Sequence, residues 1–137
     1  MGDFFAEGTH EVPLVGAGTA TLEWRYKHTL TELRLFAGGR EWTADGTDVV
    51  SALFTLRQAL EAEGLLIAVQ GARRDAQTSG MLRDMAVGAE IYLITGEPGP
   101  PATVETLAPA EPGQAATLAH QREFGEQLRG RPGAKDS

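Results

Sequence analysis

The spacing of apolar residues changes once in the first half of the chain, from every second residue to the spacing of a helix. Residues 19–27 alternate, with these apolar side chains on one side: Ala20, Leu22, Trp24 and Tyr26. A period of two indicates a half-buried strand. A second strand is expected at about 30–36, and the glycine pair 38–39 suits a tight hairpin turn into a returning strand at 40–43. The sequence therefore predicts an antiparallel meander.

The helical spacing follows directly in residues 49–63. Four apolar residues of this segment fall on one narrow stripe: Val49, Leu53, Leu56 and Leu60. Asp48 is a suitable N-cap, and Gly64 can adopt the left-handed conformation that ends a helix. We expect this amphipathic helix to pack on one face of the sheet.

Four aromatic residues fall in the meander: Trp24, Tyr26, Phe36 and Trp42. Because aromatic side chains fill the space between a sheet and a helix, we expect all four in the core. The alternative is that Trp24 or Trp42 is partly exposed and anchors a partner, as tryptophan does at many interface centres.

The second half has a weaker pattern. Residues 65–70 (LLIAVQ) form a continuous apolar run, which predicts a central strand covered on both faces, with 90–95 (EIYLIT) as its neighbour. The prolines and glycines of 96–101 interrupt regular structure, and 102–113 is expected to be an irregular connection. Residues 113–130 predict a weak C-terminal helix that docks on the sheet.

This order of elements predicts an α+β fold: an antiparallel sheet made of the meander and two further strands, with one main helix packed on it. The length of 137 residues suits a single domain over residues 1–130, followed by a flexible tail at 131–137. The hydrophobic fraction of 42% is that of a soluble globular protein, and no apolar run reaches the roughly 20 residues that cross a membrane. With no cysteine and no secretory signal, a cytoplasmic location is expected.

Acidic residues outnumber basic ones, 19 to 12, for a net charge of −7. Residues 1–64 carry 10 acids and 5 bases, whereas residues 65–137 carry 9 and 7. Nucleic acid is therefore not expected as a partner, because its phosphates would be repelled. A basic protein is the better match, although solubility alone also explains an acidic surface.

Residues 71–85 (GARRDAQTSGMLRDM) stand out between the apolar runs. Arginine presents a planar fork that matches carboxylate or phosphate, so Arg73, Arg74 and Arg83, held by Asp75 and Asp84, could receive an anionic group. This concentration of charge is typical of a binding site or an interface.

A purely structural interpretation of the same segment is also open. Ser79 can cap a short helix over residues 80–86, with Met81 and Met85 facing the core at a spacing of four. Asp75 would then pair with one of two solvated arginines, which contributes about 0–1 kcal/mol.

The motif GARRD at 71–75, followed by SGM at 79–81 and RDM at 83–85, resembles a small family of uncharacterised bacterial proteins associated with toxin-immunity loci. The resemblance covers about residues 20–95 and includes the helix sequence LFTLRQALEAEG. It brings no catalytic residue with it. Residues 76–78 depart from the more hydrophobic, proline-containing stretch of that family, which argues against a shared ligand.

Other chemistry has little support in the sequence. His10, His28 and His120 are far apart and lack ligand spacing, so neither a metal nor another cofactor is expected. The stretch VGAGTA at 15–20 lacks the lysine of a phosphate-binding loop and leads into a strand. Ser79 has no strand-to-helix elbow before it that would make it a nucleophile.

Two functional hypotheses follow. The first is a non-enzymatic binding protein, most concretely an immunity-type protein that neutralises a cognate bacterial toxin. Glu23, Glu32 and Glu41 on the meander would steer a basic toxin domain, and the 71–85 segment would make specific contacts. The second is a small enzyme or ligand-binding domain for an anionic metabolite, with the three arginines as a clamp and Asp75 or Asp84 as a base.

Overall fold

The described residues form two antiparallel sheets and three α-helices, which confirms the predicted α+β fold. The structure is a computed structural model that describes residues 6–27 and 29–130. The predicted flexible tail, 131–137, lies outside these residues. In order, the elements are β1 (Ala6–Val15), β2 (Gly18–Lys27), β3 (Leu30–Ala37), β4 (Arg40–Gly46), α1 (Val49–Glu61), β5 (Leu66–Ile67), the 3-10 turn η1 (Gln70–Ala72), β6 (Ala76–Gln77), α2 (Gly80–Met85), β7 (Glu90–Leu93), β8 (Ala102–Glu105), η2 (Pro112–Gln114) and α3 (Leu118–Gly130).

The larger sheet has the strand order β4-β3-β2-β1-β5. The predicted meander is confirmed as β2, β3 and β4, and the turn at Gly38 and Gly39 has the positive φ values, 55° and 80°, that a tight hairpin needs. Strand β1 was not predicted from the sequence. Its first inward positions are small or polar, and Gly8 is required there because a Cβ would approach the Trp24 ring to 2.5 Å. Hydrophobic alternation is therefore visible only near Val12.

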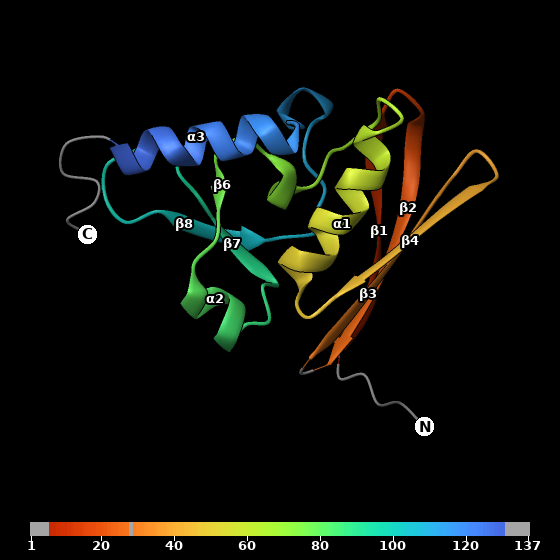
Figure 1. Cartoon of the computed structure of the whole chain (residues 1–137), viewed down its shortest axis with the longest axis horizontal. Coiled ribbons are helices and arrows are strands. Elements are labelled where there is room, and N and C mark those ends of the chain that lie inside the picture. The colour runs from red at the N-terminus through yellow and green to blue at the C-terminus, as the bar shows by residue number, and fades with distance from the viewer. Residues whose placement is uncertain (1–5, 28, 131–137) are drawn as a thin grey trace.

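Helix α1 packs on one face of this sheet, as predicted (Figure 1). It begins after Asp48, whose carboxylate accepts a hydrogen bond from the Ser51 backbone N at 2.7 Å. It is followed by Gly64 at φ 76°. The buried core between α1 and the sheet includes fully buried aliphatic side chains from both: Leu14, Leu22, Leu33, Leu35, Val49, Leu56 and Leu60. Burial of such side chains contributes roughly 1.5–3 kcal/mol each.

The aromatic residues of the meander divide between the two faces. Trp42 is buried in the core, and Trp24 and Tyr26 pack against it while partly exposed. The prediction that Phe36 lies in the core is wrong. Phe36 faces the other side of β3, where the Arg34 guanidinium lies 5.0 Å from its ring centroid.

The second half differs from the predicted single sheet. Residues 65–70 do not form a central strand of the larger sheet: Leu66 and Ile67 pair at its edge beside β1, and Val69 forms an isolated antiparallel bridge with Pro109. Strand β7 lies instead in a second sheet with the order β6-β7-β8. Part of the connection predicted as irregular is β8. The apolar run at 65–70 is buried because α1 packs on it, β1 lies along one side and the irregular 105–110 segment along the other. The Ala68 carbonyl oxygen, for example, accepts a hydrogen bond from the Ala110 backbone N at 2.9 Å.

Helix α3 starts at Leu118 rather than at 113, because Pro112–Gln114 forms a 3-10 turn before it. The Thr117 hydroxyl accepts a hydrogen bond from the His120 backbone N at 3.1 Å and so caps the helix. In Figure 1, α3 and the second sheet lie on the side of α1 away from the meander. Within the described residues, no helix has the length and apolarity needed to cross a membrane.

Candidate functional site

The face of the meander opposite α1 carries a group of charged side chains. Alternation along β1–β4 directs one set of side chains away from the core, and we call this surface the open face. Its charged members are Glu7, Glu11, Glu23, Arg25, Lys27, Glu32, Arg34, Glu41 and Asp45, six acidic and three basic residues. No helix of the described chain covers it (Figure 1).

Strand register sets the charges of the open face in rows across the sheet. Glu7, Arg25, Glu32 and Asp45 are neighbours on successive strands. The Arg25 guanidinium lies 2.8 Å from the Glu32 carboxylate, a cross-strand ion pair. The charge order along this row, acid, base, acid, acid, leaves an excess of negative charge.

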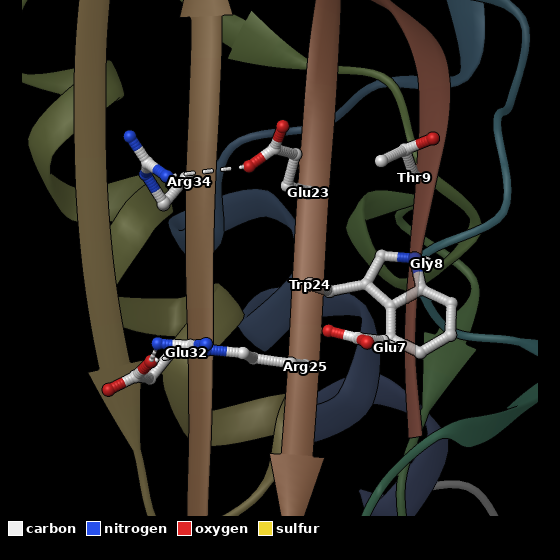
Figure 2. A pocket seen from close by; sticks show the side chains of 8 residues that line it. All are labelled: Glu7, Gly8, Thr9, Glu23, Trp24, Arg25, Glu32 and Arg34. Carbon is white, nitrogen blue, oxygen red and sulfur yellow. Dashed lines mark hydrogen bonds and ion pairs between the residues drawn. The ribbon is translucent and has the colours of Figure 1, made fainter. Parts of the chain in front are cut away.

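Arg34 connects the other two predicted glutamates. Its guanidinium lies 3.6 Å from the Glu23 carboxylate (Figure 2) and 3.1 Å from that of Glu41. All three predicted steering residues, Glu23, Glu32 and Glu41, therefore lie on one face, and each has an arginine beside it. Exposed pairs of this kind contribute only about 0–1 kcal/mol to stability but hold the carboxylates in defined positions.

Three further carboxylates on the open face were missed in the sequence. Glu7, Glu11 and Asp45 make no ion pair within residues 6–27 and 29–130. Glu11 accepts a hydrogen bond from the Thr21 hydroxyl at 2.7 Å. The alternation that would reveal Glu7 and Glu11 is hidden in β1, and Asp45 lies beyond the strand predicted at 40–43, since β4 continues to Gly46.

A shallow hollow of about 370 Å³ lies in the open face. Figure 2 shows its lining: Glu7, Gly8, Thr9, Glu23, Trp24, Arg25, Glu32 and Arg34. Gly8 and Thr9 leave room on β1, whereas long charged side chains rise from β2 and β3. The Trp24 ring lies against Gly8 on the inner side of the sheet, which supports the floor of the hollow. Such a site can receive a cationic side chain between carboxylates.

The arginines of the 71–85 segment point to different partners. Both Arg73 Nε and Arg73 Nη2 donate to the Asp75 carboxylate at 2.9 Å, and Arg73 Nη1 donates to Gln70 Oε1. The pairing of Asp75 with an arginine is confirmed, but Arg73 is not solvated, since only 17% of its side chain is exposed. The Arg74 guanidinium lies 4.8 Å from the centroid of the Phe124 ring in α3, a cation–π contact.

Arg83 pairs with Asp48, the N-cap of α1, and not with the predicted Asp84. Its Nε donates to Asp48 Oδ2 at 2.7 Å, and Nη2 donates to the Ser51 hydroxyl at 2.6 Å. Burial raises the pKa of the Asp48 carboxyl, but hydrogen bonds from Arg83 and Ser51 outweigh that effect, so the pKa lies below its ordinary value. The pair therefore joins α2 to the start of α1.

The other predicted residues of this segment have local roles or face solvent. The Ser79 hydroxyl accepts from the Leu82 backbone N at 3.2 Å and caps α2, as predicted. Asp84 is exposed. Met81, predicted to face the core, is 58% exposed, so that prediction is wrong; the side chain of Met85, predicted to face the core with it, lies outside the described part of the structure.

The open face and the 71–85 segment are not brought together. The open face points away from α1, whereas Arg83 contacts Asp48 and Ser51 at the N-terminus of α1. Figure 1 shows α2 and β6 on the far side of α1 from the meander. A single flat partner surface could not contact both regions. That the segment makes specific contacts with a partner stays a prediction.

Histidine does not gather with other metal ligands in the described part of the chain, where no three His, Asp or Glu side chains are placed to hold a metal ion. His10 Nε2 lies 3.1 Å from the Glu105 carboxylate, a contact between the two sheets. His28 lies outside the described residues. His120 of α3 is exposed.

Comparison with known proteins adds no functional assignment. No protein-family model matches the chain, and neither does any curated protein. The geometry and charge of the open face are therefore the basis on which a function can be argued.

Proposed function

We propose that this is a non-enzymatic protein-binding protein that binds a basic protein through its open face. The observation that carries the proposal is the excess of six acidic over three basic residues on a sheet face that no described helix covers. The fold does not require this excess, because these side chains lie outside the core. An immunity-type protein that neutralises a cognate bacterial toxin is the most concrete form of the proposal.

Electrostatics favours such a role. A concentrated negative field increases the rate at which a basic partner is met, and ordered carboxylates give it a fixed pattern to match. Arg25 and Arg34 hold three of the glutamates, which lowers the entropy lost when they bind. Toxins that act on nucleic acid or nucleotides are basic around their sites, so an acidic face can cover such a site.

The alternative, a clamp for an anionic metabolite, is not favoured by the geometry. Arg73, Arg74 and Arg83 are each held by a different partner and do not converge on one point. An anion would have to displace Asp75 or Asp48 to reach two of them.

A charge-matched pair of variants tests the proposal. The first replaces Glu7 and Glu11 by Gln and Asp45 by Asn on the open face. The control replaces Glu97, Glu123 and Glu126, three exposed acids elsewhere, by Gln. Both variants change the net charge equally, from −7 to −4 (−7 + 3). Neither leaves an arginine of the open face without its carboxylate.

The binding assay uses the toxin candidate encoded by the reading frame beside this gene, with association rates measured at low and high salt. We expect the open-face variant to associate roughly tenfold more slowly at low salt, and the control to keep the wild-type rate. Coexpression should rescue growth with wild type and control, and less well with the open-face variant. Equal rates for both variants, or a rate independent of salt, would contradict the proposal.

A further inference from the structure

A groove of about 530 Å³ lies between α1 and α3, with the second sheet beneath it. It is lined on the α1 side by a stripe of residues that does not face the meander: Val50, Phe54, Arg57 and Glu61. Ile91 and Thr106 lie among the residues beneath it, and Leu118 and Gln121 line it from α3. This size is within the range of small-molecule sites, about 300–1,000 Å³.

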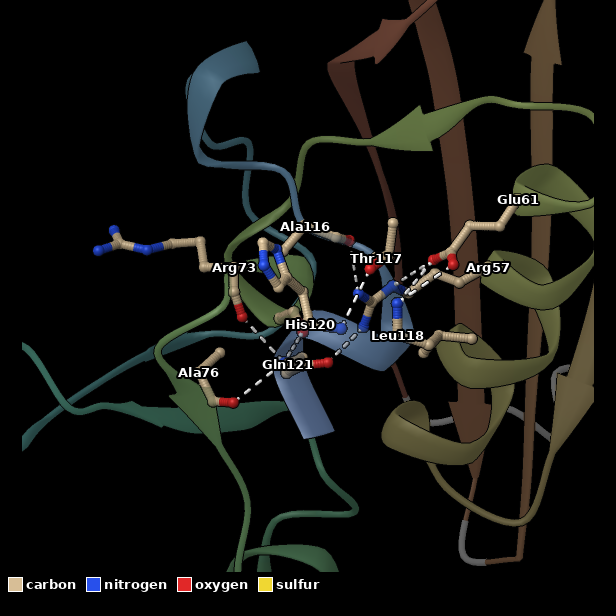
Figure 3. A network of polar contacts seen from close by, with 10 residues as sticks. Arg57, Glu61, Arg73, Ala76, Ala116, Thr117, Leu118, His120 and Gln121 are labelled. Carbon is tan, nitrogen blue, oxygen red and sulfur yellow. Dashed lines mark hydrogen bonds and ion pairs between the residues drawn. The ribbon is translucent and has the colours of Figure 1, made fainter. Parts of the chain in front are cut away.

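Arg57 is the unusual residue of the groove, because it is a cation only 3% exposed. Its Nη1 donates to Gln121 Oε1 at 2.6 Å and its Nη2 donates to the Ala116 carbonyl oxygen at 2.8 Å (Figure 3). Two of its five N–H groups thus have acceptors among the described residues. Both acceptors are neutral.

The nearest carboxylate does not neutralise Arg57 by a hydrogen bond. Glu61 Oε2 lies 3.7 Å from Arg57 Nε, which is too long, while the Glu61 carboxylate accepts from the Leu118 backbone N at 3.1 and 3.2 Å. Burial therefore lowers the pKa of Arg57 to about 10, and the charge of Glu61 opposes that shift only in part. Buried charges are normally paired with a hydrogen-bonded counter-ion, and Arg57 lacks one in the described chain.

A second donor without an acceptor lines the same groove. Gln77 Nε2 is buried and has no hydrogen-bond partner among the described residues. The Gln77 amide lies against Gly125 of α3: a Cβ added at position 125 would lie 2.8 Å from Gln77 Oε1. Gly125 is one helical turn, about 5.4 Å, from Gln121, which contacts Arg57. The two donors thus lie along one side of α3.

Much of the remaining lining is apolar and partly open, with Gln58, Thr78 and Thr106 among it. Phe54 is 49% exposed at the groove, and Val50, Leu53, Ile91 and Leu118 extend the apolar surface. A ligand that fits this lining has hydrogen-bond acceptors with negative charge at one end and an apolar body at the other. The groove also departs from the acidic character of the chain, because Arg57 and Arg122 line it against the single carboxylate of Glu61.

We propose that the groove between α1 and α3 binds a small amphipathic carboxylate, whose head group accepts from Arg57 and Gln77 and whose apolar part lies against Phe54. This site is separate from the open face, so it does not depend on the function proposed above. Gln121 completes the site from the other side: its Nε2 donates to the carbonyl oxygens of Gly71, Arg73 and Ala76 at 3.0 Å and holds α3 in place.

The test uses octanoate, octanol and octylamine as probes of equal chain length, titrated calorimetrically into the full-length protein. We expect octanoate to bind roughly tenfold or more tightly than octanol, because its charge is matched by donors that lack acceptors, and octylamine not to bind. The Arg57 Nε–H resonance should shift with octanoate. Binding of octylamine as tight as that of octanoate, or no binding of octanoate, would overturn the proposal.

Two variants separate the head group from the apolar part without removing Arg57, on which the position of α3 depends. Gln77→Met keeps the length of the side chain and removes the unpartnered donor, so it should fold normally and lose the preference for octanoate over octanol. Phe54→Ala removes an exposed ring and should weaken the binding of octanoate and of octanol about tenfold.

Matched substitutions outside the groove are the controls: Gln127→Met on α3 and Thr55→Ala on α1, both at exposed positions. They should bind both probes as wild type does. Unchanged preference for octanoate in Gln77→Met, in a protein with a wild-type melting temperature, would show that Gln77 does not hold the head group and would overturn the proposed site.

Discussion

The meander and α3 are attached to α1 by different kinds of contact. On the meander side, fully buried aliphatic residues such as Leu22, Leu35 and Leu56 form a continuous core. On the other side, α3 buries only Gly125 among its residues. It is held by Arg57 and by hydrogen bonds from the Gln121 side chain to three backbone carbonyls.

The two kinds of contact should be lost in different ways when the protein opens or unfolds. Apolar burial is nondirectional and is lost mainly when the whole core opens, whereas a polar contact fails when one partner moves. We therefore expect the region around α3 to open locally, below the free energy of global unfolding, while the meander and α1 open together. The following substitutions compare the two regions, from the largest expected effect to the smallest.

The largest effect is expected in the core. Leu56→Ala should lower the free energy of unfolding by about 2–5 kcal/mol, because the side chain is fully buried and leaves a cavity. Urea denaturation measures this change. Thr55→Ala, exposed on the same helix, should change stability by less than about 0.5 kcal/mol. Similar effects of the two substitutions would mean that the meander side does not depend on its apolar core.

A smaller, local effect is expected at Gln121. Gln121→Ala removes the acceptor of Arg57 and the donor to the three carbonyls, which should cost roughly 1–3 kcal/mol. Amide hydrogen exchange should speed up in α3 and β6 and stay unchanged in β2 and β3. Gln127→Ala, exposed on α3, serves as the control. Uniform acceleration across both sheets would remove the distinction between the two regions.

The pair of Asp48 and Arg83 should make a pH-dependent contribution to the free energy of unfolding. Asp48→Asn keeps the helix cap but weakens the contact with Arg83, for an expected loss of up to about 1 kcal/mol at neutral pH, since Arg83 is partly exposed. The folded pKa of Asp48 is below its ordinary value of 3.8. The wild-type advantage is therefore present above pH 3.8 and disappears as pH falls through the folded pKa.

Stability curves of wild type and Asp48→Asn between neutral and acid pH test this sign. The two curves should converge in acid. The stability curve of Asp84→Asn, a substitution at an exposed position of α2, should stay parallel to that of wild type over the whole pH range. A difference between wild type and Asp48→Asn that grows in acid would show that the carboxylate at position 48 does not stabilise the fold.

The smallest effect is expected on the open face. Glu32→Gln weakens the exposed pair with Arg25 and should change the unfolding free energy by less than about 0.5 kcal/mol. Thermal denaturation at low and high salt measures it. A loss above about 1 kcal/mol would mean that the charges of the open face belong to the structure of the meander rather than being available for a partner.

Prediction from the sequence succeeded where periodicity is strong. The alternation of residues 19–27 and the stripe of α1 were sufficient to place β2, α1 and the outward direction of Glu23. It failed at β1, where Gly8 and His10 occupy inward positions and hide the alternation. It also failed at residues 65–70, because an apolar run indicates burial and does not say whether strands lie on both sides.

In the candidate sites, too, some features follow from the local sequence and others depend on residues that are distant in the chain. That Glu23, Glu32 and Glu41 lie in the meander follows from the sequence, but their common face with Glu7, Glu11 and Asp45 depends on strand register. The partners of Arg83 lie 35 and 32 residues away, and Gln121 contacts Arg57 across 64 residues. Nothing local in the sequence marks these pairs.

By itself the sequence determined the local elements with regular apolar spacing, the acidic balance of the chain and the cap of α1. The tertiary structure alone decided that β7 belongs to a second sheet, that the three arginines of the 71–85 segment face different partners, and that Arg57 lies buried in a groove. The physical reason is that apolar periodicity is a property of residues close together in the sequence and can be observed there directly. Hydrogen bonds and ion pairs of buried polar groups depend instead on which distant segments meet, and that is settled only when the core has packed.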